Sequence, residues 1–517
     1  MAYRLVFDIG SKTAKCAIGN DDDEIVAMDS FRPGVIVSED GFCRSHDAST
    51  IWREILALAK RTIDASGIDP NAIRFVTCSS IRPSCVFSDV HDDPIYVGSS
   101  FDMRGINSAD IIEPKFEKLA GKSFLQATGH FPALMYPPAR YAWFKENEPE
   151  NCARIARYMP VDSWILAKLG AEEHANIGSA VESGFYDITT MDWNYEWSNI
   201  LDLPDNFFPP VVQSGEIVGN VSSDALIELG LSREAEIVAG LPDTQAALIG
   251  AGCVQDLDAG IVVGSTTPIQ VLKKDMYLDP QSRIWTTRIN LKHVVDSYII
   301  EASTGITGQI LTWLAGLLYA DDGQFNPDFY ARIDAEYDAI DAEELTSPEA
   351  AREVLAFLGP DHLAAAQNTI VPGVFVFPTP GTVEETSLSR KQFIASMFEN
   401  IGFAVYKNLQ FLQGLVGQSL HDTCLLGGVT RASTFCQRFS DLAGLTIKTT
   451  VEKEATISGL LLSCSVAEGN IKTTSDLVDK LTSRNMIVDF QPRNAMTDVF
   501  RRRFDTWDRM RDKIKNL

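Results

Sequence analysis

The chain has 517 residues and a formal net charge of −25, and 45% of its residues are apolar. This length is too great for one hydrophobic core, so we expect two or more domains. The ordinary apolar and charged content argues against a disordered or fibrous protein. The acidic balance disfavours nucleic acid and anionic membrane surfaces as partners, but it does not exclude a phosphate-bearing small molecule, because local loops and backbone amides can bind phosphates.

The cysteines and the apolar segments narrow the class further. Nine cysteines are scattered without a C-x-x-C pair, which disfavours a disulfide framework or a structural zinc site. No apolar run approaches the ~20 residues that a membrane-spanning helix needs. The apolar run at the N-terminus is interrupted by Asp8 and lacks a cleavage site, so it reads as a buried strand rather than a secretory signal. We therefore expect a cytoplasmic protein.

The first hundred residues alternate between strand and helix patterns. Residues 5–9 and 14–18 are apolar runs joined by a polar turn, which predicts a β-hairpin. Apolar residues at helical spacing predict a helix over 51–63, and residues 73–77 read as a strand. This alternation is typical of an α/β domain.

A second strand–turn–strand unit appears in the second half of the chain. Residues 261–263 and 269–272 flank the turn Gly-Ser-Thr-Thr-Pro, after a short strand at 237–239. The repetition suggests two related domains, each of which offers a hairpin to a shared cleft.

Two segments read as additions to these domains. The acidic, helix-prone stretch 319–357 is expected to be a surface insertion. Residues 497–517 place apolar side chains at steps of three and four, which predicts an amphipathic helix. We expect this helix to pack onto its own domain, although a partner-binding tail is the alternative.

The first chemical motif lies in the turn of the N-terminal hairpin. Asp8 ends a strand and is followed by Gly10, Ser11 and Lys12. Backbone N–H groups of such a turn can form an anion nest, and the carboxylate can hold Mg²⁺ through its waters. The alternative is a plain hairpin turn.

Two further turns have the small residues that let a phosphate or a flat base approach the backbone. The turn Gly264, Ser265 and Thr266 has the same character as the first motif. Gly427 and Gly428 follow a predicted strand and precede a helix, where a base or ribose could lie close to the main chain. A tight packing turn is the alternative for the glycine pair.

The fourth motif is Gly-Leu-Pro-Asp-Thr-Gln at 240–245, before a predicted helix at 246–249. Asp243 is a candidate general base that accepts the proton of an attacking hydroxyl. The alternative is that Asp243 only caps the helix.

The order and spacing of the four motifs resemble the FGGY carbohydrate kinases over roughly residues 3–470. The resemblance implies an ATP-dependent sugar kinase of α/β class, with two actin-like (ribonuclease H-like) ATPase domains flanking a cleft. It implies a sugar-binding domain at 1–248, a nucleotide-binding domain at 249–485 and a C-terminal amphipathic helix at 486–517. It also implies ATP and Mg²⁺, with Asp243 catalytic, Asp8 at the metal, and nucleotide contacts from Gly10, Ser11, Lys12, Gly264, Ser265, Thr266, Gly308, Gly427 and Gly428.

The substrate half of the resemblance rests on Arg82 and Asp102, with Asp243 and Thr244 beside them. A guanidinium and a carboxylate can satisfy polyol hydroxyls in fixed geometry, and the alternative is a structural ion pair. Xylulose kinases typically carry Gln-Met-His-Gly where this chain has Ser-Ser-Ile-Arg-Pro at 79–83. Other segments look most like autoinducer-2 kinases, among them 94–96, 127–129 and 453–456. A xylulose, ribulose or other polyol kinase stays open.

Several positions depart from the family pattern. Residues 427–430 read Gly-Gly-Val-Thr rather than Gly-Gly-Gly-Ser, Ser440 replaces an alanine, and 378–382 lack the usual Gly-Glu-Arg-x-Pro. The altered glycine motif leaves open a degenerate sugar sensor, and a non-kinase actin-like ATPase stays open because it would share the phosphate turns. The expected partner is a small sugar or polyol, and a homodimer is left open.

Overall fold

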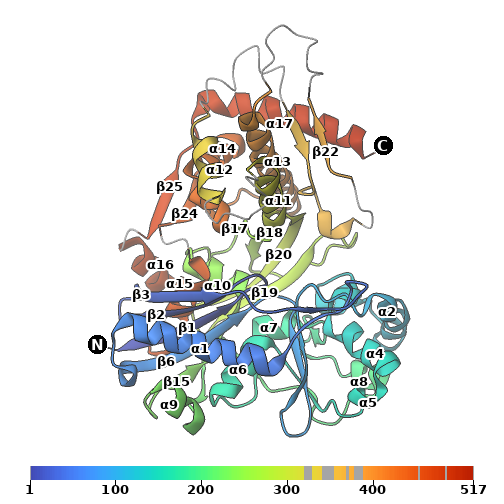
Figure 1. Ribbon diagram of the computed structural model, residues 1–517. Coiled ribbons are helices and arrows are strands. Elements are labelled where there is room, and N and C mark those ends of the chain that lie inside the picture. The colour runs from blue at the N-terminus through green and yellow to red at the C-terminus, as the bar shows by residue number, and fades with distance from the viewer. Residues whose placement is uncertain are drawn as a thin grey trace. The chain divides into compact units, whose positions relative to one another are not determined.

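The computed structural model describes residues 2–319, 329–340, 354–367, 372–377, 388–451, 454–483 and 486–515. The chain packs as two compact units (Figure 1). Unit 1 comprises Met1–Gln255, Lys273–Ile299 and Glu454–Leu481, and unit 2 comprises Asp256–Leu272, Ile300–Lys453 and Thr482–Leu517. These units differ from the ranges 1–248 and 249–485, because two later segments pack with the N-terminal part of the chain. The domain ranges 1–248, 249–485 and 486–517 therefore stay a prediction.

The central sheet of unit 1 is built around the N-terminal hairpin. Its strand order is β14 (Ile217–Asn220), β15 (Glu236–Val238), β6 (Ile73–Ser80), β1 (Tyr3–Ile9), β2 (Ala14–Gly19) and β3 (Ile25–Phe31), and β16 (Leu241–Pro242) also pairs with β6. The predicted hairpin is confirmed, since β1 and β2 pair antiparallel. Six of the seven residues of β1 are buried, as expected for a strand covered on both faces.

The register of three parallel strands brings distant residues to one edge of this sheet. Asp8 of β1 pairs with Ser79 of β6, which pairs with Leu241 of β16. The chain therefore leaves all three strands side by side, and the next residues include Gly10, Arg82 and Asp243. The carboxyl ends of parallel strands are the usual place for ligand sites in α/β folds.

The helix predicted at 51–63 is α1 (Ala48–Ser66). Asp47 caps its first turn by accepting a hydrogen bond from Thr50 N at 2.8 Å. Gly67 ends it with φ +68°, a left-handed conformation that glycine adopts without steric cost. Its apolar side packs into the core that covers the central sheet.

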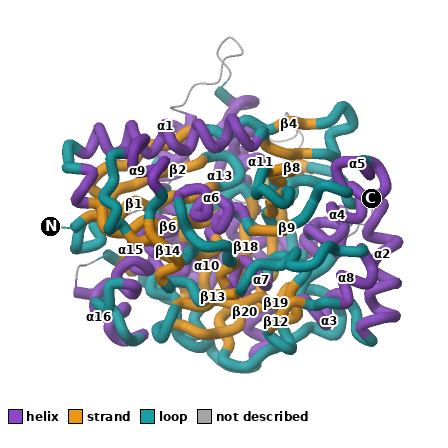
Figure 2. The backbone as a smooth tube through the Cα atoms, turned by 90° about the horizontal axis from the view of Figure 1, so that it is seen from below, coloured by secondary structure: helices purple, strands orange, loops and turns teal. Residues whose placement is uncertain are grey.

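A second, aromatic core lies in residues 85–208 of unit 1. Strands β8 (Pro94–Gly98), β7 (Cys85–Ser88) and β9 (Arg157–Met159) contribute side chains to it, and their sheet has the order β4 (Ile36–Val37), β5 (Arg44–His46), β8, β7 and β9. Helices around it are α2 (Ile106–Ala120), α3 (Phe124–Thr128), α4 (Pro137–Asn147), α5 (Pro149–Cys152), α7 (Ile177–Val181) and α8 (Glu196–Leu201) (Figure 2). Helix α6 (Val161–Leu169) packs into the first core instead. Further elements of unit 1 are β10 (Ala175–Asn176), β11 (Tyr186–Asp187), β12 (Asp192–Trp193), β13 (Val211–Val212), α9 (Ser223–Leu229), β19 (Trp285–Leu291) and α16 (Thr474–Ser483).

The helix that begins with Asp243 is held by close backbone packing. This helix, α10 (Asp243–Gly250), lies against α15 (Ala455–Ala467). A Cβ at Gly250 would lie 2.0 Å from Ala455 O, and a Cβ at Gly459 would lie 1.9 Å from Ala246 O. Only glycine allows this approach at these two positions.

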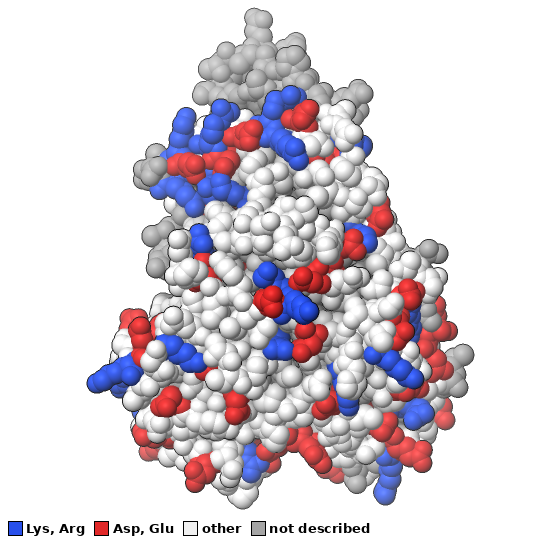
Figure 3. Space-filling model, turned by 180° about the vertical axis from the view of Figure 1, so that it is seen from behind, with Lys and Arg blue, Asp and Glu red and all other residues white. Residues whose placement is uncertain are grey.

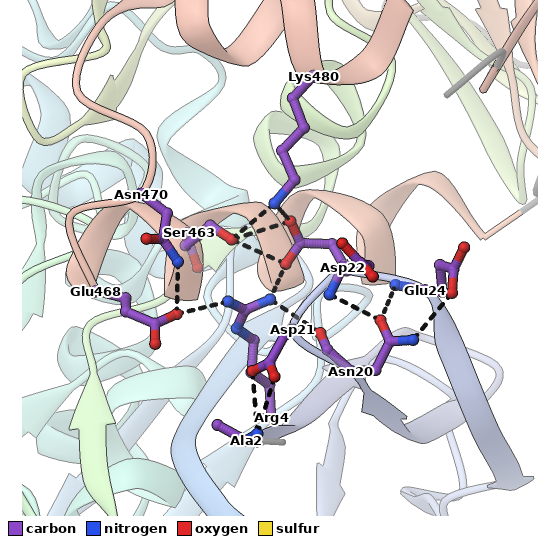
Figure 4. Close-up of polar contacts among 12 residues, drawn as sticks. Ala2, Arg4, Asn20, Asp21, Asp22, Glu24, Ser463, Glu468, Asn470 and Lys480 are labelled. Atoms are coloured by element: carbon purple, nitrogen blue, oxygen red, sulfur yellow. Dashed lines mark hydrogen bonds and ion pairs between the residues drawn. The ribbon is translucent and has the colours of Figure 1, made fainter. Parts of the chain in front are cut away.

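A buried polar cluster fixes the segment 454–481 to the N-terminal hairpin within unit 1 (Figure 4). Arg4 of β1 pairs with Asp23 and, at 2.8 Å, with Glu468. Lys480 also pairs with Asp23, and Ser465 Oγ donates a hydrogen bond to Asp23 Oδ1 at 2.9 Å. Burial raises the pKa of Asp23, while Arg4 and Lys480 oppose the shift. The cluster holds the C-terminal end of α15, the helix against which α10 packs.

Unit 2 repeats the sheet topology of unit 1. Six strands of its seven-stranded sheet run in the order β20 (Val295–Ile306), β18 (Thr266–Lys273), β17 (Ala259–Val262), β23 (Thr423–Leu426), β24 (Ile447–Thr450) and β25 (Ile487–Phe490). β17 pairs antiparallel with β18 and parallel with β23, as β1 pairs with β2 and β6. The second predicted hairpin is therefore confirmed, and both units have the actin-like α/β arrangement.

The C-terminal helix α17 (Asn494–Ile514) packs within unit 2. Trp507 stacks on Phe357 with 5.7 Å between ring centroids, and Arg503 pairs with Glu399 at 2.8 Å. The other elements of unit 2 are α11 (Gly308–Leu318), α12 (Phe329–Asp338), β21 (Leu355–Phe357), β22 (Val374–Val376), α13 (Arg390–Val416) and α14 (Ser433–Ala443). Much of the acidic stretch 319–357, and the altered motif at 378–382, lie outside the described residues.

Acidic and basic side chains lie side by side on the face drawn in Figure 3, although the net charge is −25. No helix in the described part of the chain is long and apolar enough to cross a bilayer.

Candidate active site

Asp243 is the first residue of α10 and follows β16 directly. Thr244 N donates a hydrogen bond to Asp243 Oδ1 at 2.8 Å, while Pro242 occupies the cap position. Asp243 thus sits inside the first helical turn, where the helix dipole favours a negative charge. The Thr244 hydroxyl bonds to Gln245 Oε1 at 2.8 Å, so Thr244 orients its neighbours on both sides.

The surroundings of Asp243 shift its proton affinity toward neutral pH. Burial raises its pKa to about 7, Arg82 opposes that shift, and the carboxylates of Asp8 and Glu182 add to it. A carboxyl group of this pKa can accept a proton near neutral pH, which is the property that a general base needs.

Arg82 is held by a buried glutamate that no sequence motif marked. Arg82 Nη1 lies 2.5 Å from Glu182 Oε1, and the two side chains are 9% and 7% exposed. Glu182 also accepts hydrogen bonds from Thr287 Oγ1 at 2.7 Å and from Gln245 Nε2 at 3.2 Å. Gln245 lies two residues after Asp243, so one network includes Arg82 and the helix that begins with Asp243.

His130 completes this network on the other side of Glu182. Its Nε2 lies 3.1 Å from Glu182 Oε2, and its Nδ1 lies 2.8 Å from Thr128 O. Burial alone would raise the pKa of Glu182, but Arg82, His130 and the hydrogen bond from Thr287 together hold it well below the ordinary value. Glu182 is therefore ionised throughout the physiological pH range.

Asp102 lies in a different network. Its Oδ2 accepts hydrogen bonds from Tyr96 and, at 2.7 Å, from Arg104 Nε, and its side chain is fully buried. None of the contacts recorded for Asp102 within the described chain involves Arg82 or Asp243. This arrangement matches the alternative of a structural ion pair, and a contact between Asp102 and a sugar stays a prediction.

Asp8 is brought next to the expected base by the sheet register. Its Oδ1 accepts a hydrogen bond from Ser79 Oγ at 3.0 Å, and its Oδ2 lies 4.0 Å from Lys15 Nζ. Lys15 also pairs with Glu454. Burial raises the pKa of Asp8, and the Lys15 charge opposes that shift.

The turn after Asp8 is tight, because the backbone of Gly10 lies close to that of Thr13. Gly10 N donates to Thr13 O at 3.1 Å, and a Cβ at Gly10 would lie only 2.9 Å from that oxygen. Ser11 is half-buried and Lys12 is exposed beside it. A turn of this kind can offer backbone N–H groups, a hydroxyl and an ammonium group to a phosphate.

In unit 2, the structure brings together two of the predicted nucleotide motifs. Gly308 N donates to Gly264 O at 2.9 Å, and a Cβ at Gly308 would lie 2.7 Å from the same oxygen. Thr307 N also donates to Ser265 O at 2.8 Å. The start of α11 therefore rests on the turn that includes Thr266.

The glycine pair lies beside the same turn. Gly427 has φ +92°, and a Cβ there would lie 2.4 Å from Val263 O, so only glycine fits without displacement. A Cβ at Gly428 would meet no atom of the described residues within 4 Å, which leaves room for a ligand. Thr430 Oγ1 donates to Gly427 O at 2.8 Å, so the departure at Thr430 gives the turn an internal hydrogen bond.

Mg²⁺ is commonly bound through one or two carboxylates together with substrate phosphates. The carboxylate of Asp8, at the strand end beside the phosphate-type turn, fits such a donor set. Within the described residues, no group of three or more His, Cys, Asp or Glu side chains is placed to hold a metal ion by itself.

Two α/β units of matching topology, each with a glycine-containing turn in its central hairpin, define a protein of the actin-like ATPase fold class. The model of the FGGY family of carbohydrate kinases, N-terminal domain, matches residues 3–250. YoaC of Bacillus subtilis, which is named as a sugar kinase, is 25% identical over 442 residues, covering 85% of this chain and 84% of that protein. An autoinducer-2 kinase of Klebsiella pneumoniae is 20% identical over 520 residues, covering 98% and 93%.

A solved structure has the same fold along nearly its whole length. The gluconate kinase of Lactobacillus acidophilus superposes with a TM-score of 0.80 at 16% identity, covering 99% of this chain and 98% of that one. Residues 3–250 thus place the chain with the FGGY family of carbohydrate kinases, and the whole chain has the fold of the gluconate kinase.

Proposed function

We propose that this carbohydrate kinase transfers the γ-phosphoryl group of ATP to a hydroxyl of a small sugar or polyol, with Asp243 as the general base. The observation that carries the proposal is a buried carboxylate, with a pKa of about 7, at the same sheet edge as Asp8 and its turn. Phosphoryl transfer requires positioning and charge stabilisation, and little covalent chemistry from the protein.

Each site residue has a defined part in this proposal, except Asp102, whose contact with the sugar stays a prediction. Asp243 accepts the proton of the attacking hydroxyl, while Arg82 and Thr244 orient the acceptor. Gly10, Ser11 and Lys12, and likewise Gly264, Ser265 and Thr266, are the proposed phosphate contacts. Gly308, Gly427 and Gly428 contact the adenosine. Mg²⁺, which Asp8 would hold, supplies charge neutralisation at the transferring phosphoryl group.

The acceptor class is taken from the relatives. An autoinducer-2 kinase matches almost the whole chain, and the segments noted above resemble that branch. We propose an acceptor like that of autoinducer-2 kinases, and a five-carbon ketose or another polyol is the alternative. The side chains described near Asp243, among them Arg82 and Thr244, are polar, which suits each of these acceptors.

The test is a phosphorylation screen of the full-length protein with ATP and Mg²⁺ across ketoses, polyols and the autoinducer-2 precursor, with ADP release as the readout. We expect one acceptor class to stimulate ADP release strongly above the basal rate. Basal hydrolysis that no acceptor stimulates would contradict the kinase proposal and favour an actin-like ATPase that uses the same turns.

A further inference from the structure

The ion pair between Arg82 and Glu182 bears on which acceptors the proposed site can take. Glu182 follows α7 and accepts hydrogen bonds from residues of three other segments of unit 1, namely Arg82, Gln245 and Thr287. His130 Nε2 lies 3.1 Å from its second oxygen. A carboxylate held by this many partners cannot rotate away without leaving buried donors unsatisfied.

The pair carries no net charge. Glu182 is ionised because Arg82, His130 and its hydrogen bonds outweigh the effect of burial on its pKa. Arg82 is the positive group that most strongly lowers the pKa of Asp243, and Glu182 acts on Asp243 in the opposite direction. The guanidinium is therefore neutralised by a protein carboxylate, and an acceptor carboxylate would have to compete with Glu182 for it.

We propose that Glu182 is a specificity-determining residue that occupies Arg82 and thereby restricts the acceptor to uncharged sugars and polyols, excluding sugar acids. This inference rests on the proposed function, since it concerns the acceptor site beside Asp243. It separates substrates that the fold alone does not separate, because a protein of the same fold is named as a gluconate kinase.

The physical reason is the balance of charge around Asp243. Asp8, Asp243 and Glu182 are carboxyl groups close enough to interact, and Arg82 is the positive group among the strongest influences on Asp243. A sugar acid would add a further negative charge to a partly buried site, where charge repulsion is poorly screened. A hydroxyl needs only a hydrogen bond, and a paired guanidinium can still take part in one because it has five N–H donors.

The test uses acceptor pairs that differ only at one terminal carbon, namely glucitol with gluconate and xylitol with xylonate. Binding to the full-length protein is measured by calorimetry, and phosphorylation by ADP release. In the wild-type protein we expect the alditol of each pair to bind at least tenfold more tightly than the aldonate. Equal or tighter binding of the aldonates would overturn the inference.

Glu182→Gln removes the charge but keeps the size of the side chain. We expect this variant to bring the alditol-to-aldonate ratio close to one or to reverse it, because the Arg82 charge becomes available to the acid. The double variant Arg82→Gln/Glu182→Gln removes both charges, and we expect it to restore discrimination against the aldonates. A purely structural role for Glu182 would not produce this reversal.

Glu399→Gln is the matched control. Glu399 forms an equally buried pair with Arg503, at 2.8 Å, in unit 2. We expect its selectivity ratio to equal that of the wild type. A second readout for Glu182→Gln is the pH profile of kcat/KM. Loss of the Glu182 charge lowers the pKa of Asp243, so the inflection of that profile should move to lower pH.

The outcomes distinguish this inference from the proposed function. If Glu182→Gln folds and its selectivity ratio is unchanged, Glu182 does not set acceptor charge, and the kinase proposal stands. If the wild-type protein phosphorylates aldonates and alditols equally well, the inference fails and the kinase proposal again stands. If no acceptor is bound or phosphorylated, the kinase proposal fails and takes the inference with it.

Discussion

Asp243 has chemistry that depends on burial more than on its neighbours in the chain. Its carboxylate would have an ordinary acidic pKa in solvent, and in the fold its pKa is about 7. The carboxylates of Asp8 and Glu182 raise this pKa further, and the guanidinium of Arg82 lowers it. The result is a group that can both accept and release a proton near neutral pH.

Replacement of Asp243 tests its role directly. We expect Asp243→Ala to lower kcat by roughly a hundredfold or more, the usual scale for loss of a general base. Steady-state ADP release with the best acceptor measures this, with folding checked by circular dichroism. Asp279→Asn is the control, because Asp279 is a buried aspartate of the same unit, paired with Arg283 at 2.8 Å. Near-normal turnover in folded Asp243→Ala would remove Asp243 from the mechanism.

The pKa of Asp243 also predicts a pH dependence. A general base works only when it is deprotonated, so kcat/KM should be flat well above pH 7 and should fall as pH drops through about 7. Below that point we expect roughly a tenfold loss for each pH unit. A rate profile that stays flat from pH 8 to pH 5 would show that the titrating group is not the base.

The pair of helices α10 and α15 positions the base. Both helices carry a glycine at the contact, and a side chain on either one would run into a backbone carbonyl of the other. The pairing therefore fixes where α10 begins, and so where the carboxylate of Asp243 lies relative to the sheet edge. The structure gives this role to glycines that no motif distinguishes.

Gly459→Ala tests the packing of these helices. Its Cβ would lie 1.9 Å from Ala246 O, so we expect the free energy of unfolding to fall by about 1–3 kcal/mol, as for other overpacked sites, together with a loss of kcat. Chemical denaturation and ADP release measure the two effects. Gly414→Ala on α13 is the control, because its Cβ would meet no described atom within 4 Å and alanine suits a helix interior. Equal stability of both variants would contradict the packing argument.

At the scale of the whole molecule, each unit is assembled from segments far apart in the chain. Within unit 1, Arg4 and Asp23 of the first hairpin region pair with Glu468 and Lys480, more than four hundred residues later. The N-terminal sheet therefore depends on the 454–481 segment for part of its core. Unit 2 is likewise built from three segments.

Asp23→Ala tests this long-range connection. Loss of the carboxylate leaves Arg4 and Lys480 without their shared partner in a buried position, so we expect the free energy of unfolding to fall by about 3 kcal/mol. Urea denaturation of the full-length protein measures it. Asp29→Ala breaks the exposed pair with Arg61, and there we expect a change below about 1 kcal/mol. A similar small change for Asp23→Ala would show that the cluster contributes little.

Local patterns in the sequence were enough to predict the two hairpins and their turns, and to single out Asp243 as the catalytic candidate. The two strand–turn–strand units are predicted by apolar runs on either side of a polar turn, and both are confirmed. The positions of Asp8, Asp243 and the glycines follow from short motifs whose meaning is local. Such features can be recognised because the residues that make them are neighbours in the chain.

The tertiary structure alone decided which side chains meet. Arg82 and Glu182 are 100 residues apart, and Thr287 lies 105 residues beyond Glu182, so no local pattern could have joined them. Asp102 is an aspartate in a motif of its own, as Asp243 is, but in the folded chain its carboxylate accepts hydrogen bonds from Arg104 and Tyr96. Chain composition and short-range order determined the α/β class and the turns, whereas burial and strand register determined the network around the base, because both depend on contacts that form only when the chain folds.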